Sequence, residues 1–301
     1  MVEGQEGVTW EQWVALARAC EDAGLEALFR SDHYTSFFRE GGGSLDAWAT
    51  ISALAAVTST LRLGTLVSPA TFRHPSVLAR MVVTADHVSG GRVELGLGAG
   101  WHEHEHTQHG FPFLTAPERV KLFGEQIEIV HRSWTEERFD FSGDTYTLRD
   151  AAPLPKPLAK PNLIVGGSAK PGTIGPAVRF ADEYNTIFAG PEEARRRREL
   201  VDSACEQAGR DPLTFSLMTL CVVGSDRADL DARCRRLEAL AGHRPDDRSR
   251  GAIVATVEEA AERLREYEDA GVERVMLQHL LHDDLEMVAL LGQELAPRVG
   301  A

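Results

Sequence analysis

Short apolar segments alternate with amphipathic segments of helical period along almost the whole chain. The apolar segments are dense in Val, Leu and Ile and alternate little, which is typical of parallel strands buried on both faces. Between them, apolar positions recur with the period of a helix, and the first helix has Thr9 as a plausible N-cap and ends at Gly24. We expect strands over 26–29, 61–68, 92–98, 162–165, 183–188, 215–223 and 273–279. We expect helices over 10–23, 44–58, 75–88, 117–134, 173–180, 191–208, 226–240, 257–270 and 283–295.

Seven strands with crossover helices predict an α/β fold, a TIM-type (β/α)8 barrel that forms a single domain over residues 1–301. A barrel needs eight strands and this chain opens on a helix, so the first strand is expected to be missing or replaced. Residues 1–8 are too polar and Gly-rich to supply a good strand. Either the barrel is incomplete at that position, or the start of the protein lies upstream of Met1. An open doubly wound sheet would also suit seven strands, but it would need a phosphate fingerprint in its first turn.

Two segments interrupt the strand–helix alternation. Residues 138–148 alternate around Ser142-Gly143-Asp144, which predicts a β-hairpin excursion between barrel strands 4 and 5. Residues 241–252 are polar, and we expect a loop there.

Composition narrows the function classes. The 301 residues include 32 Lys and Arg and 46 Asp and Glu, a net charge of −14, which argues against a generic nucleic-acid binder. Four Cys, at 20, 205, 221 and 234, include no C-x-x-C pair and are read as reduced thiols. Because the sequence shows neither a signal peptide nor a run of apolar residues able to span a bilayer, we expect a cytoplasmic protein without a membrane partner.

Three short motifs stand where barrel strands end, the place where chemistry gathers in this architecture. Ser31-Asp32-His33 follows the first strand; on spacing alone we favour a helix-capping Asp beside a surface His over a catalytic pair. Gly96 to Trp101 and Gly166-Gly167-Ser168 follow two further strands. Small residues there either let a long ligand approach the backbone, with N–H groups aimed at phosphate, or serve strand-end packing.

Residues His102 to His106 match H-E-x-x-H, the zinc-protease pattern. The segment follows a Gly-rich strand end and no third ligand is evident, so we favour a solvated loop and expect no metal. The runs Arg195–Arg198 and Arg235-Arg236 are flanked by acidic residues and read as solvated helix faces.

Taken together, these motifs give the chain a family resemblance. The residues that carry it are Gly24 to Phe29, Ser31-Asp32-His33, Leu61 to Thr65, Phe72-Arg73-His74-Pro75, Asp86 to Arg92, Gly98 to Trp101, Glu105 to Phe113, Trp134 to Leu148, and Pro155-Lys156-Pro157 to Gly167. The chain resembles the bacterial luciferase-like oxidoreductases, most closely the branch that uses the deazaflavin coenzyme F420. The resemblance runs from about Trp10 to the last helix.

The resemblance implies a flavin-like ring at the C-terminal face of the barrel. By it, the catalytic residues would be His33, as proton donor or acceptor, Asp32 and Glu105. A non-proline cis peptide at Leu66–Val67 would back the ring. The residues expected to bind the cofactor are Asp32, Leu66, Val67, Gly98, Gly100, Trp101, Gly166 and Gly167. Trp101 stands where the family's sugar-phosphate dehydrogenase has a catalytic Glu, so that reaction is not expected here, and Glu105 is the nearest carboxylate that could substitute.

The sequence therefore predicts an oxidoreductase that transfers hydride between coenzyme F420 and a small organic substrate. An FMN-dependent monooxygenase on the same scaffold is the first alternative, and a non-catalytic flavin-binding protein is the second. A zinc hydrolase at residues 102–106 is a third. Barrels of this family often pair, which allows a homodimer.

Overall fold

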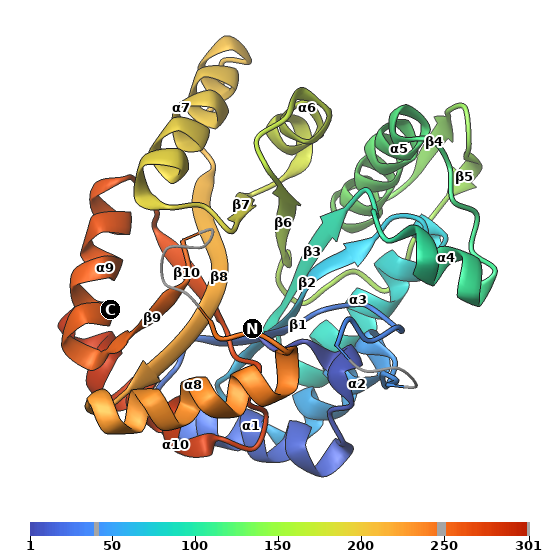
Figure 1. The fold of residues 1–301 in the computed structure, drawn as a ribbon. Coiled ribbons are helices and arrows are strands. Elements are labelled where there is room, and N and C mark those ends of the chain that lie inside the picture. The colour runs from blue at the N-terminus through green and yellow to red at the C-terminus, as the bar shows by residue number, and fades with distance from the viewer. Residues whose placement is uncertain (39–41, 246–250, 300–301) are drawn as a thin grey trace.

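The computed structural model describes residues 1–38, 42–245 and 251–299, and its strands form one parallel sheet with helices packed outside it (Figure 1). Neighbouring strands follow the order β1-β2-β3-β6-β7-β8-β10, and β9 pairs with the far half of β8. The strands of this sheet are β1 (Ala27–Arg30), β2 (Arg62–Pro69), β3 (Val93–Gly98), β6 (Asn162–Gly167), β7 (Glu183–Ile187), β8 (Thr214–Gly224), β9 (Ile253–Thr256) and β10 (Arg274–Gln278). The seven predicted strands are all present, and β9 is one that the sequence did not predict.

The helices connect successive strands and cover the sheet. They are α1 (Trp10–Asp22), α2 (Ala47–Val57), α3 (Pro75–Ser89), α4 (Glu103–His109), α5 (Ala116–Thr135), α6 (Pro171–Phe180), α7 (Pro191–Gln207), α8 (Arg227–Ala241), α9 (Val257–Asp269) and α10 (Leu285–Ala289). Thr9 caps α1 in a capping box with Gln12, as its position predicted. The last predicted helix is shorter than expected, because after α10 the chain continues as a π-helical turn, Leu290–Leu295, and a 3-10 turn, Ala296–Arg298.

Two short elements escaped prediction. Helix α4 occupies part of the His-rich segment for which a loop was expected, and β9 follows the polar segment 241–252. That polar segment lies partly outside the described residues. Strand β9 adds its hydrogen bonds along Cys221–Gly224 of β8, which is longer than the other strands.

The predicted hairpin is present between β3 and β6 as the antiparallel pair β4 (Phe139–Ser142) and β5 (Thr147–Ala151). Its turn is fixed to α5 by Glu125, whose carboxylate accepts hydrogen bonds from the backbone N–H groups of Asp144, Thr145 and Tyr146 at 2.7–3.2 Å. The excursion lies outside the sheet and adds no strand to it (Figure 1).

The first barrel strand is replaced by two residues, Met1 and Val2. The Val2 N–H donates to the Phe29 carbonyl at 2.9 Å, and the Val2 carbonyl accepts from the Ser31 N–H at 3.1 Å. On the other side, the Met1 amine donates to the Leu277 carbonyl at 2.9 Å, and the Met1 carbonyl accepts from the His279 N–H at 2.8 Å. Met1 and Val2 thus join β1 to β10 at one level of the wall.

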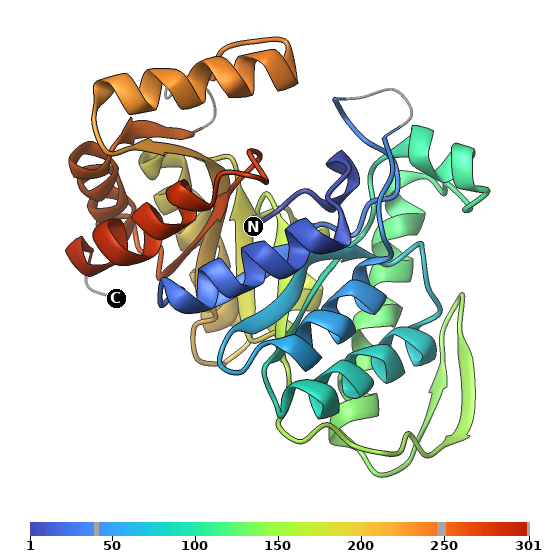
Figure 2. The same cartoon turned by 90° about the horizontal axis from the view of Figure 1, so that it is seen from below.

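An apolar cavity of about 530 Å³ adjoins these two residues. Its walls are Ala27–Phe29 of β1 and Arg274–Leu277 of β10, with Leu16 and Cys20 of α1 on its outer side. Figure 2 shows α1 and α10 running next to each other over this part of the sheet. Met1 and Val2 therefore lie where a missing or replaced first strand was expected, and the cavity lies beside them.

A network of ion pairs fills the end of the barrel where the strands begin. Glu94 of β3 accepts from the Arg62 Nε at 2.5 Å and from the Arg274 Nη1 at 2.7 Å, and Glu183 of β7 also contacts Arg274 at 3.1 Å. Burial alone would lower the pKa of Arg274, but the carboxylates of Glu94 and Glu183 raise it. This end of the barrel is closed by paired charges, which leaves the opposite end for chemistry.

Candidate active site

The predicted site residues gather at the carboxyl ends of the parallel strands. Asp32 and His33 directly follow β1, the segment Leu66–Val67 lies in β2, and Gly98 ends β3. Gly166 and Gly167 end β6 in the same sheet. Because all these strands run in one direction, the imidazole of His33 and the glycine-rich strand ends lie on the same edge, opposite the ion-pair network.

His33 forms an ion pair with Glu105, which α4 supplies from 72 positions further along the chain. The His33 Nδ1 lies 2.8 Å from the Glu105 Oε2, and the other carboxylate oxygen accepts from the backbone N–H groups of Tyr34 at 2.5 Å and Thr35 at 3.1 Å. The Glu105 side chain is fully buried and that of His33 is 14% exposed. The predicted residues His33 and Glu105 are thus brought together.

The contact between His33 and Glu105 shifts the pKa of both groups. Burial alone would lower the pKa of His33, but the hydrogen bond and charge of Glu105 raise it above its ordinary value. Burial would raise the pKa of Glu105, and the His33 imidazole with the two backbone donors lowers it instead. With Nδ1 held by a carboxylate, Nε2 is the nitrogen left to exchange a proton with a bound molecule.

Asp32 is buried and saturated by hydrogen bonds from β2 and the loop after it. The Ser68 hydroxyl donates to it at 2.7 Å, and Arg73 donates in a bidentate pair at 2.6 and 3.1 Å. Arg73 also donates to Asp46 at 2.8 Å, and the Trp48 indole N–H donates to Ser68 at 3.0 Å. Asp32, the residue that precedes His33 in the chain, is therefore held in place by three hydrogen bonds.

Sequence reasoning missed these partners of Asp32. Arg73 belongs to the Phe72-Arg73-His74-Pro75 motif that carried the resemblance, but nothing in its position revealed which carboxylate it would meet. Its place four residues after the end of β2 was the available clue, since strand ends supply functional side chains in this architecture.

The predicted non-proline cis peptide at Leu66–Val67 is present. The Val67 side chain lies among the glycines of the neighbouring strands: a Cβ on Gly98 would come within 2.7 Å of a Val67 methyl, and one on Gly166 within 2.9 Å of the other. These two glycines therefore leave room for Val67, so the packing explanation that the sequence left open applies to them.

The other two predicted glycines face polar groups. A Cβ on Gly100, which has φ +78°, would lie 2.8 Å from the Thr71 hydroxyl, and one on Gly167 would lie 2.6 Å from the Tyr184 hydroxyl. Tyr184 also accepts a hydrogen bond from the Ala169 N–H at 2.9 Å, which shapes the turn into α6. The glycines at the end of β6 therefore give room to neighbouring side chains, and the strand leads to the N-terminus of α6.

Trp101 belongs to a cluster of rings around His33. The centroid of the His33 ring lies 5.1 Å from that of Phe37 and 5.9 Å from that of Trp101, both edge-on, and Phe37 stacks on Trp101 at 5.7 Å. His102 joins edge-on to Phe37 at 5.1 Å. We call these four side chains the aromatic cluster; Trp101 is 63% exposed in it.

The H-E-x-x-H match does not form a zinc site of the protease kind. His102 precedes the seven-residue helix α4, and His106 faces the other way: its Nε2 lies 2.7 Å from the Thr71 hydroxyl and its Nδ1 lies 2.7 Å from the His102 carbonyl. Within residues 1–38, 42–245 and 251–299, no three His, Cys, Asp or Glu side chains gather as metal ligands would.

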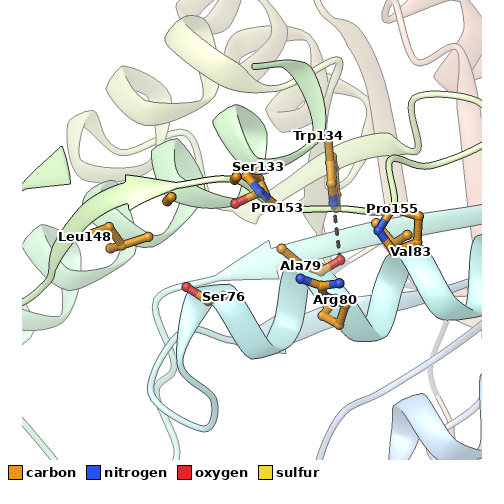
Figure 3. Close-up of a pocket in the computed structure, with 11 residues that line it drawn as sticks. Ser76, Ala79, Arg80, Val83, Ser133, Trp134, Leu148, Pro153 and Pro155 are labelled. Atoms are coloured by element: carbon orange, nitrogen blue, oxygen red, sulfur yellow. Dashed lines mark hydrogen bonds between the residues drawn. The ribbon is translucent and has the colours of Figure 1, made fainter. Parts of the chain in front are cut away.

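A small pocket of about 190 Å³ lies elsewhere, between α3, α5 and the segment after the hairpin (Figure 3). The Trp134 indole N–H donates to the Ala79 carbonyl at 3.4 Å beside it. None of the predicted site residues lines this pocket.

None of the helices in the described ranges is long and apolar enough to cross a bilayer.

Comparisons with known proteins agree with this architecture. Residues 2–274 match the family model described as luciferase-like monooxygenase. The chain is 29% identical over 306 residues to an F420-dependent glucose-6-phosphate dehydrogenase of Microbacterium testaceum (strain StLB037), covering 93% of this chain and 90% of the relative.

Solved structures share the fold at lower identity. An F420-dependent secondary alcohol dehydrogenase in complex with an F420-acetone adduct superposes with a TM-score of 0.83 at 19% identity, covering 100% of this chain and 99% of that one. The monooxygenase RslO1 from Streptomyces bottropensis gives a TM-score of 0.80 at 23% identity, with 98% of each chain covered. The predicted TIM-type α/β fold is confirmed. Because the family model spans nearly the whole barrel, the chain belongs to the luciferase-like monooxygenase family and is an oxidoreductase enzyme.

Proposed function

We propose that this enzyme transfers hydride between coenzyme F420 and a small organic substrate, with His33 giving or taking the accompanying proton. The observation that carries the proposal is the His33–Glu105 pair. A buried carboxylate holds Nδ1 at 2.8 Å and leaves Nε2 for proton exchange, on the edge of the sheet where the glycine-rich strands end. The resemblance to F420-dependent relatives supports the choice of coenzyme.

The chain offers a fitting surface for a flat ring with a phosphate-bearing tail. Leu66–Val67 would back the ring, with Gly98 and Gly166 closing around Val67. The turn after β6 would receive the tail, because Gly167 leads to Lys170 and to the N-terminus of α6, a region that favours anions. The deazaflavin would supply the hydride chemistry, and the protein would supply orientation and exclusion of water.

Asp32 acts through position in this proposal. Arg73 donates to both oxygens of its carboxylate and Ser68 donates to Oδ2, so Asp32 fixes the backbone from which His33 projects. Arg73 and Ser68 are therefore positioning residues, and His33 is the residue that exchanges the proton.

A binding titration tests the proposal. Purified protein is titrated with coenzyme F420 and, separately, with FMN, following the fluorescence of each. We expect saturable binding of F420, and weaker binding of F420 in a Lys170→Ala variant, which removes the cation at the N-terminus of α6. Absence of F420 binding in the unmodified protein would refute the proposal.

An FMN-dependent monooxygenase is the second candidate, because the matching family model is that of luciferase-like monooxygenases. Such an enzyme would consume oxygen when supplied with reduced FMN and a substrate, whereas a deazaflavin does not support oxygen activation. Oxygen uptake with reduced FMN, compared with hydride transfer to F420, separates the two candidates.

A further inference from the structure

The aromatic cluster leaves large ring surfaces uncovered beside the atom that exchanges the proton. Trp101 is 63% exposed and Phe37 is 39% exposed, although both lie within 6 Å, centroid to centroid, of the half-buried His33 ring. Their rings stack at an interplanar angle of 28° and form one continuous apolar surface. Exposed aromatic side chains packed against a reactive group are suited to bind an apolar or aromatic molecule.

Three buried carboxylates, those of Glu105, Glu3 and Asp32, act on the His33 imidazole. Asp32 is compensated by Arg73, which it shares with Asp46, and by the buried Arg30. Glu105 and Glu3 therefore supply the negative charge beside the ring. An anionic substrate placed at Nε2 would meet this negative field, whereas an uncharged one would not.

The chemistry available at His33 limits the reacting group. A single imidazole nitrogen beside a hydride acceptor can take one proton while the neighbouring carbon loses a hydride. An alcohol with a C–H bond on the same carbon meets this requirement: the C–H electron pair passes to the oxidised deazaflavin, the O–H proton passes to Nε2, and a C=O bond forms. The reverse reaction reduces the ketone with a proton from His33 and hydride from the reduced coenzyme.

We propose that the substrates are uncharged aromatic alcohols and their ketones, bound against Trp101 and Phe37, and that sugar phosphates are excluded. This inference rests on the proposed function and gives its substrate class. It assigns Trp101 to substrate specificity in place of the coenzyme-binding role expected from the sequence.

The test compares matched substrates on the F420-loaded enzyme. 1-Phenylethanol is the neutral probe, 4-(1-hydroxyethyl)benzoate is the same molecule with one negative charge, and glucose 6-phosphate is the dianionic probe. We expect kcat/KM for 1-phenylethanol to exceed that for the benzoate by about ten-fold or more, the discrimination that ~1.4 kcal/mol of repulsion gives. We expect no turnover of glucose 6-phosphate.

Variants locate the binding surface. Trp101→Ala and Phe37→Ala should each raise KM for 1-phenylethanol by about ten-fold, with kcat changed much less, because each removes one aromatic contact. Trp101→Phe should retain most of the affinity. Trp10→Ala, which removes an indole 36% exposed at the start of α1, is the matched control and should leave KM unchanged.

Equilibrium binding gives a readout that does not depend on turnover. Acetophenone should quench tryptophan fluorescence in the unmodified protein, and Trp101→Phe should lose that quenching while Trp10→Phe keeps it.

The outcomes distinguish this inference from the proposed function. If F420 does not bind, the proposed function fails. If F420 binds but the charged probes are oxidised as well as or better than 1-phenylethanol, or if neither is oxidised, the substrate class is wrong and the coenzyme assignment stands. Unchanged KM and unchanged acetophenone binding in Trp101→Ala would also overturn the inference.

Discussion

Replacing Glu105 with Gln tests the pair on which the proposed chemistry depends. A glutamine carbonyl can still accept from Tyr34 and Thr35, the two N–H groups now bound to Oε1 at 2.5 and 3.1 Å. The amide NH2 group of the glutamine then faces the His33 Nδ1. Because NH2 only donates, Nδ1 must accept this hydrogen bond, and protonation of Nδ1 would break it. Only the charges of Glu3 and Asp32 then oppose the burial that lowers the pKa of His33, so this pKa should fall.

The size of the effect follows from the contacts. A hydrogen bond to a charged group contributes about 1.5–3 kcal/mol, and this one joins a fully buried carboxylate to a ring 14% exposed. We expect Glu105→Gln to lower the free energy of unfolding by about that amount near neutral pH. We expect kcat/KM to fall by about 100-fold, the lower end of the range for general acid–base catalysis, because the imidazole is no longer held ready for the proton.

The difference in the free energy of unfolding between the unmodified protein and Glu105→Gln should change with pH in a direction that the two pKa shifts determine. The pKa of His33 is raised, so its contribution is complete below the ordinary 6.5 and is lost as the pH rises through the raised value. The pKa of Glu105 is lowered, so its contribution is complete above the ordinary 4.5 and is lost as the pH falls through the lowered value. The difference between the unmodified protein and Glu105→Gln should be largest between 4.5 and 6.5 and should shrink on both sides.

The assay combines urea unfolding at several pH values with NMR titration of the His33 ring. Glu103→Gln is the control, since this exposed carboxylate lies on the same helix two residues away. Equal pKa values of His33 in Glu105→Gln and in the unmodified protein would show that the carboxylate does not control the imidazole, and the reasoning would be refuted.

Three further substitutions test the supports of the site. Arg73→Met leaves the buried Asp32 carboxylate without its bidentate partner, and we expect the free energy of unfolding to fall by about 3–5 kcal/mol, measured by thermal or urea unfolding. A decrease below about 1 kcal/mol would contradict the idea that Arg73 holds Asp32 in place. Gly98→Ala places a Cβ 2.7 Å from a Val67 methyl and should cost about 1–3 kcal/mol, and Val67→Ala in the same chain should restore most of that stability if the two side chains compete for one space. Arg274→Met should destabilise by about 3–5 kcal/mol because it leaves the Glu183 carboxylate without a cation, while Glu94 keeps Arg62; the Kd for F420 should stay unchanged, which a titration of the folded variant checks.

Periodicity and turn chemistry predicted most of the framework. The seven strands, the hairpin and the cap at Thr9 depend on local patterns, and the structure has them near the expected residues. Strand β9 has only four residues and follows the polar segment 241–252, so its short apolar run was not recognised as a strand; the far half of β8 pairs with it. Helix α4 was read as a loop because five of its seven residues are His or Glu with no apolar repeat.

The sequence indicated the individual residues of the candidate site, but not how they contact one another. His33 and Asp32 stood out because they follow a strand, and Glu105 stood out as a carboxylate near the position now held by Trp101. That Glu105 binds His33, and that Arg73 takes up Asp32, depends on how β1, β2 and α4 meet in three dimensions. The sequence also did not reveal that Gly98 and Gly166 lie against Val67.

Met1 and Val2 form a seam between β1 and β10, and the position of His33 depends on this seam. Four backbone hydrogen bonds hold β1 to β10 there, and one of them ends on Ser31, two residues before the imidazole. The seam is two residues long, whereas β1 pairs with β2 over four, and a cavity adjoins it, so this seam should open before other parts of the wall and its amides should exchange with solvent sooner. Each opening would release the segment that carries His33, so the lifetime of the closed seam sets an upper limit on how long the catalytic geometry persists.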